Sequence, residues 1–173
     1  MPRSYPGALA LTRRILRGLI VLNLLMGFLI LVLLVASLVA EGTVMEALGL
    51  RRGGEASVIL GMRLIMVLGI AAVPLTHFVL RRLLSVVDTV REGDPFVAEN
   101  AVRLRAIAWA VLGLELMHLV VGGVAAGASS AAQPLDIDWN FSFTRWLAAL
   151  LLFVLASVFE HGARMREDLE GTV

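Results

Sequence analysis

The chain has 173 residues, of which 59% are hydrophobic and 17% charged, and its net charge is +1. That balance is the reverse of a soluble domain. So small a net charge argues against direct binding of nucleic acid, which needs a concentrated basic surface. The sequence contains no cysteine, which excludes disulfides, thiolate metal ligands and cysteine nucleophiles.

Four long apolar stretches fill most of the chain, at about 15–40, 58–80, 104–126 and 143–158. A helix needs ~20 residues to cross the hydrocarbon of a bilayer, and these stretches mostly lack the polar face of a soluble helix. Too little chain remains between them for a separate globular domain, which usually needs more than ~40 residues. We therefore predict an all-α integral membrane four-helix bundle, with residues 1–173 as a single membrane domain.

The arginines are distributed unevenly between the two sides of this bundle. One side carries Arg51 and Arg52. The other side carries eleven, which are Arg3, Arg13, Arg14, Arg17, Arg81, Arg82, Arg91, Arg103, Arg105, Arg164 and Arg166. Because positive residues stay in the cytoplasm, we expect both termini to be cytoplasmic.

The connector after the second span contains clear signals for helix ends. Apolar residues recur at helical spacing over 83–90 with charged residues between them, which predicts an amphipathic extension of the second helix. Gly93 suits a left-handed stop, and Pro95 cannot continue a helix. We expect Phe96 to pack against lipid or another helix, and Asn100 to be the N-cap of the third helix.

The fourth helix is also expected to continue beyond its span, to about Leu169, with charged side chains along it. Phe78-Val79-Leu80 precedes Arg91-Glu92 at the spacing by which Phe153-Val154-Leu155 precedes Arg166-Glu167. This similarity, unless it is a coincidence of apolar sequence, indicates two helical hairpins with similar cytoplasmic extensions. On the opposite side we expect a short helix around 44–50. There Trp139, Phe141, Phe143 and Trp146 suit the aromatic belt of a membrane interface.

Ionisable residues inside membrane spans are functional candidates, because an unpaired one is costly in lipid. Glu115 and His118 share one face of the third helix, and Arg63 lies ~8 Å inside the second. We predict an intramembrane polar cluster in which Arg63 pairs with Glu115 and His118 lies alongside. Three interpretations stay open: helix-locking hydrogen bonds of ~0.6 kcal/mol each, a sensor based on histidine titration, and a transport pathway.

Metal and enzyme chemistry have little support. Glu115-Leu116-Met117-His118 matches the Glu-x-x-His pattern of di-iron bundles, but such sites need two of these motifs and two further glutamates. Haem held by His77 and His118 is rejected because the two lie at different depths. The chain has no phosphate-binding glycine loop and no framed Ser/His/Asp order, so we predict no metal, no cofactor and no catalytic residue.

Several short motifs are shared with a known family. They are Gly93-Asp94-Pro95-Phe96, Asn100, Arg103-Leu104-Arg105, Asp136-Ile137-Asp138, and the ending from Phe159-Glu160-His161-Gly162 to Thr172-Val173. In order and spacing they resemble a bacterial membrane family catalogued as domain of unknown function 2975, from roughly the second span to the end. The resemblance implies a small multi-span protein of no assigned activity, whose gene in many genomes neighbours a helix-turn-helix regulator.

We therefore expect a regulatory or sensory membrane component whose connector and tail bind that cytosolic regulator. The connector residues are Gly93, Asp94, Pro95, Phe96, Asn100, Arg103 and Arg105, and the tail residues are Glu160, Arg164, Arg166 and Asp168. The alternative is a small transporter or channel, assembled as a homo-oligomer, that uses Glu115 and His118. A neighbouring helix-turn-helix gene favours regulation, whereas a neighbouring nucleotide-binding subunit favours transport.

Overall fold

The computed structural model describes residues 6–48, 56–129 and 142–170. Every regular element in this part of the chain is a helix. The helices are α1 (Pro6–Val39), α2 (Glu41–Ala47), α3 (Ala56–Arg91), α4 (Ala98–Ala128) and α5 (Phe143–Glu170). All but α2 are long and apolar enough to cross a membrane. The predicted all-α, four-helix, multi-pass membrane architecture is confirmed.

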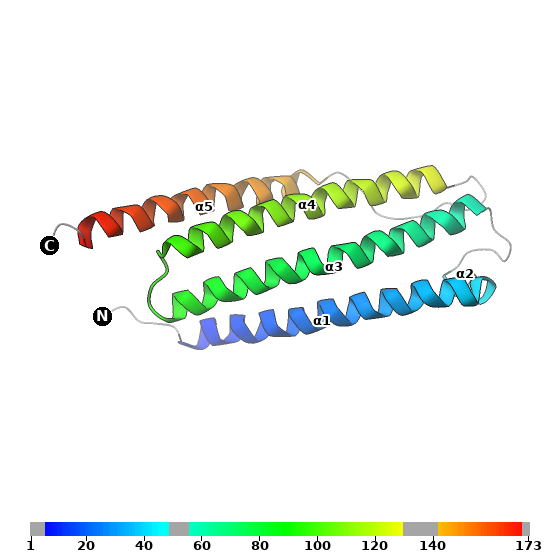
Figure 1. Cartoon of the computed structure of the whole chain (residues 1–173), viewed down its shortest axis with the longest axis horizontal. Helices are drawn as coiled ribbons and strands as arrows, with labels where there is room; N and C mark the ends of the chain where they lie inside the picture. Colours follow the sequence, from blue (N-terminus) through cyan, green and yellow to red (C-terminus); the bar gives the residue numbers. More distant parts are fainter. Residues whose placement is uncertain (1–5, 49–55, 130–141, 171–173) are drawn as a thin grey trace.

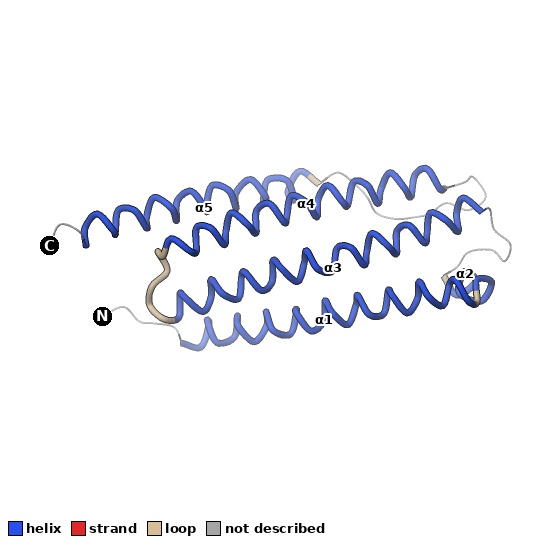
Figure 2. Tube along the Cα trace, viewed as in Figure 1, coloured by secondary structure: helices blue, strands red, loops and turns tan. Residues whose placement is uncertain are grey.

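The four long helices form an up-and-down row in which each packs against the next along the chain (Figures 1 and 2). The two predicted hairpins, α1 with α3 and α4 with α5, are joined through packing of α3 on α4. Figure 1 shows the start of α1 and the end of α5 at one end of the row, together with the end of α3 and the start of α4. We call this the stem end, and the opposite end, where α2 lies, the loop end.

Close backbone approach fixes α1 against α3. A Cβ added at Gly27 would lie 2.8 Å from a methyl group of Val73, so this position requires glycine unless the valine moves. The Asn23 side-chain amide donates to the Val73 carbonyl at 3.1 Å. Nearer the stem end, Arg13 and Asp88 form an ion pair at 3.0 Å. The two helices are therefore joined by polar contacts as well as by apolar packing.

The helix ends at the connector follow the sequence signals. α3 continues past its predicted span to Arg91, and Gly93 adopts the left-handed φ of 92° that suits glycine. α5 likewise continues to Glu170, which confirms both predicted extensions. The short helix expected around 44–50 lies somewhat earlier, at Glu41–Ala47.

The apolar part of α3 is bounded by Arg63 and Arg81, which are about 27 Å apart along the helix axis. That length is close to the ~30 Å of bilayer hydrocarbon. The middle of this interval is level with Glu115 of α4, because a Cβ at Gly113 would lie 3.3 Å from Leu75. Glu115 is therefore a mid-membrane residue.

α5 is displaced toward the stem end relative to α4 (Figure 1). Arg145, in the first turn of α5, lies level with Glu115, and α4 continues from Glu115 to Ala128 for about 20 Å more. Phe143 and Trp146 lie in the first turn of α5, at the beginning of the fourth candidate membrane span, and their place in an aromatic belt stays a prediction. Residues 136–141, where other predictions fall, lie outside the described residues.

Candidate functional site

Asn100 is the centre of a hydrogen-bond network that joins α3, the connector and α4. Its side chain is fully buried. Its amide donates to Thr89 Oγ1 at 2.8 Å and to the Pro95 carbonyl at 2.9 Å. Its Oδ1 accepts from the Arg103 guanidinium at 2.8 Å. One side chain thus holds two helix ends and the turn between them.

This arrangement corrects the predicted capping role of Asn100. The helix begins two residues earlier, at Ala98, and its N-cap is Val97, which has an extended backbone and makes no side-chain cap bond. Asn100 therefore lies within the first turn, where its side chain reaches back to Pro95 rather than forward to a helix amide. The sequence signal identified a polar residue at the right helix end but not its partner.

Phe96 fixes the connector onto α5, in accordance with the prediction that it packs against lipid or a helix. Its ring lies 5.2 Å from the ring of Phe159, centroid to centroid. A Cβ at Gly162 would lie 2.9 Å from the Phe96 ring, so the glycine makes room for it. Beside this contact, Asp94 forms an ion pair with Arg166. The predicted connector and tail residues therefore meet in space.

Glu160 bridges two arginines between α4 and α5. It accepts from Arg105 at 2.5 Å and from Arg164 of its own helix at 2.7 Å. The hydrogen bond and charge of Arg105 hold the pKa of the Glu160 carboxyl below its ordinary value of 4.5, with Arg164 acting in the same direction and desolvation opposing. The carboxylate is therefore charged at neutral pH and links the two helices.

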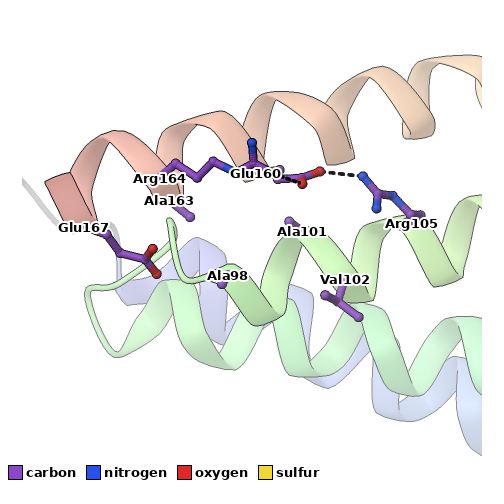
Figure 3. Close-up of a pocket in the computed structure, with 8 residues that line it drawn as sticks. All are labelled: Ala98, Ala101, Val102, Arg105, Glu160, Ala163, Arg164 and Glu167. Carbon is purple, nitrogen blue, oxygen red and sulfur yellow. Dashed lines mark hydrogen bonds and ion pairs between the residues drawn. The ribbon is translucent and has the colours of Figure 1, made fainter.

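A cleft of about 220 Å³ opens beside this bridge, between the start of α4 and the end of α5 (Figure 3). Its apolar wall is built from small residues, and its rim carries two arginines and two glutamates. The lining residues are Ala98, Ala101, Val102, Arg105, Glu160, Ala163, Arg164 and Glu167. In Figure 3 the Glu160 carboxylate lies between the two guanidinium groups. Asp168, the remaining predicted tail residue, is exposed near the end of α5.

The predicted pair of Arg63 with Glu115 is not formed. The Arg63 guanidinium turns toward the loop end, where it donates to Glu41 at 2.7 Å and to the Ser37 carbonyl at 2.6 Å. Glu41 is the first residue of α2 and follows the end of α1 by two residues, so its carboxylate lies close to Ser37. Sequence reasoning missed Glu41 because it considered only the ionisable residues inside the four spans as partners for Arg63.

Glu115 instead has an arginine of α5 as its partner. Arg145 Nη1 lies 3.8 Å from Glu115 Oε2, and the Glu115 side chain is only 14% exposed. His118 shares the helix, and its Nε2 is buried without a hydrogen-bond partner among the described residues. The available signal was the place of Arg145 inside the fourth apolar stretch, 143–158, which makes it an ionisable residue within a predicted span.

No group of three or more metal-ligating side chains comes together within the described residues. His77, weighed above as a haem ligand, accepts a hydrogen bond from Arg81 Nε at 3.2 Å on its own helix.

Residues 54–173 match the family described as "Protein of unknown function (DUF2975)". That range includes the connector, α4, α5 and the stem-end cleft. No curated protein and no solved structure matches the chain.

Proposed function

The chain belongs to the DUF2975 family, whose description names no activity, and we propose that it is a regulatory or sensory membrane component that binds a cytosolic protein at its stem end. The observation that carries the proposal is the cleft between α4 and α5. It combines an apolar wall with a charged rim, and the side chains around it are held in place by the Glu160 bridge. Preorganised side chains lose less entropy on binding.

The orientation of the chain supports the same proposal. The arginine excess lies at the stem end, and the positive-inside rule assigns that end to the cytoplasm. We propose the bacterial inner membrane as the location, with both termini cytoplasmic. A reporter fused to the carboxyl terminus should be active only in its cytoplasmic form, and activity of a periplasmic reporter there would contradict the assignment.

The cleft restricts the chemistry of the partner. A wall built from Ala98, Ala101 and Val102 has room for small or medium apolar side chains, such as those on one face of a helix. The rim charges Arg164 and Glu167 would pair with an acidic and a basic residue beside that face. The resemblance of this chain's motifs to the family points to a helix-turn-helix regulator as the candidate partner, since genes for such regulators neighbour genes of family members.

Co-purification with the product of a neighbouring helix-turn-helix gene tests the proposal. Arg164→Gln removes a rim charge from a 67% exposed side chain without placing a second carboxylate beside Glu160, and Val102→Trp blocks the cleft from a 65% exposed position. Both variants should lose the partner while their thermal midpoint in detergent stays near that of the parent chain. Arg91→Gln makes the same charge change at the end of α3 and should keep the partner. Equal recovery in all three variants would contradict the proposal.

The second candidate is a small oligomeric transporter or channel that uses Glu115 and His118. The observation in its favour is that Glu115 and Arg145 pair at mid-membrane beside a histidine nitrogen that has no partner among the described residues. Such polar groups often mark ion or proton pathways. The pair equally suits a structural link between α4 and α5. Measuring ion flux and thermal stability in a Glu115→Gln variant separates this structural role from transport.

A further inference from the structure

Two apolar grooves run along one broad face of the helix row, in the half of the membrane nearest the stem end. The first lies between α1 and α3 and has a volume of about 430 Å³. It is lined by Leu24, Val73, Pro74, His77, Phe78 and Arg81. The Leu24 side chain is 51% exposed, so this groove is open to surrounding lipid.

The second groove lies between α3 and α4 and has a volume of about 560 Å³. It shares Pro74 and Phe78 with the first, which makes these two side chains a ridge between the grooves. Pro74 is near mid-membrane, and Arg81 is about 10 Å closer to the stem end. Both grooves therefore run from the middle of the apolar layer toward its charged boundary.

Three arginines lie at the charged end of this ridge. Arg81 borders the first groove, where it donates to His77, and Arg82 lies over the Phe78 ring at 5.0 Å from its centroid. Arg17 precedes Leu24 by seven residues, which places it on the same face of α1 and about 10 Å toward the stem end. Three arginines thus lie at the level where the two grooves reach the charged end of the apolar layer, two on α3 and one on α1.

These three arginines differ from most others at the stem end in having no carboxylate partner within the described residues. Arg13 pairs with Asp88, and Arg105 pairs with Glu160. Among the described residues, the Arg81 guanidinium donates to the His77 ring and that of Arg82 lies over the ring of Phe78. Their positive charge is therefore uncompensated where lipid phosphates lie.

We propose that this face is a binding site for an anionic diacyl phospholipid. The phosphate lies among Arg17, Arg81 and Arg82, and the two acyl chains lie in the two grooves on either side of Phe78. Guanidinium groups bind phosphate oxygens through paired hydrogen bonds, and basic pockets between membrane helices bind anionic headgroups. This proposal does not depend on a protein partner at the stem-end cleft.

Native mass spectrometry of the detergent-purified full chain tests it, with phosphatidylglycerol and phosphatidylcholine of identical acyl chains supplied in equal amounts. We expect the parent chain to retain phosphatidylglycerol preferentially. Arg81→Gln and Arg82→Gln should each reduce that preference about fivefold, the effect of one arginine near an anionic surface. Arg91→Gln, the same change further along α3, should leave it unaltered.

Two further arms separate a site from general lipid contact. Single-chain lysophosphatidylglycerol should be retained less than the diacyl lipid, because it leaves one groove empty. Inorganic phosphate at the same concentration should not displace the bound lipid. Equal retention of both diacyl headgroups, an equal loss in Arg91→Gln, or displacement by phosphate alone would each overturn the proposal.

Discussion

Replacing Asn100 by alanine should destabilise the contact between α3 and α4 more than any neighbouring polar substitution. The change removes two hydrogen bonds between neutral groups, to Thr89 and Pro95, and one from the charged Arg103. At about 1 kcal/mol for each neutral bond and about 1.5 kcal/mol or more for the charged one, the loss is about 3–4 kcal/mol. Because Arg103 can recover part of its bonding from water, we expect a cost of about 2–3 kcal/mol.

The assay is equilibrium unfolding in mixed detergent micelles by titration with sodium dodecyl sulfate, followed by helix circular dichroism. Glu99→Gln, an exposed change in the same helical turn, is the position control and should stay within about 0.5 kcal/mol of the parent chain. Asn100→Asp keeps an oxygen for Arg103 but loses both donated bonds, so it should lie between the control and alanine.

A double-mutant cycle tests the partner assignment directly. Thr89→Val removes the hydroxyl at nearly constant volume, and in the Asn100→Ala background it should cost at least about 0.5 kcal/mol less than in the parent chain. An Asn100→Ala variant within 0.5 kcal/mol of the parent, or strict additivity with Thr89→Val, would refute the reasoning that this network joins the two helices.

Three further substitutions test other contacts. Gly27→Ala places a Cβ against the stiff side chain of Val73 and should lower the free energy of unfolding by about 1–2 kcal/mol. Its control, Gly18→Ala, has open space around it on the same helix and should be neutral or stabilising by up to about 1 kcal/mol. Equal melting temperatures for the two variants would contradict this packing. Because the pKa of Glu160 is lowered on folding, its stabilisation is present above its ordinary pKa of 4.5 and is lost as the pH falls through the folded value. Thermal midpoints measured from pH 7 to pH 3 should therefore fall less in Glu160→Gln than in the parent chain, and parallel curves would show that the bridge contributes nothing. If the Glu115–Arg145 pair only holds α4 and α5 together, Glu115→Gln should lower the thermal midpoint without affecting any ion flux in proteoliposomes. Loss of a flux in a variant that keeps its fold would favour the transport alternative.

Local signals predicted the helix ends well. The left-handed backbone at Gly93 and the continuation of α3 to Arg91 follow from residues within one turn of each other. The continuation of α5 to Glu170 likewise follows from helical spacing along one segment. Asn100 shows the limit of such signals, because a residue suited to capping also suits a network, and the choice depended on where Thr89 and Pro95 lie.

The amino-acid sequence by itself determined that the protein lies in a lipid bilayer, where its four spans are, and which helices carry charged extensions. Apolar length and arginine placement act on each segment independently of its neighbours. Only the tertiary structure decided which charges meet. Arg63 pairs with Glu41 because the end of α1 packs beside the start of α3, and Glu115 meets Arg145 because α5 is displaced along α4. That displacement results from side-chain packing between helices, which periodicity along one helix does not encode.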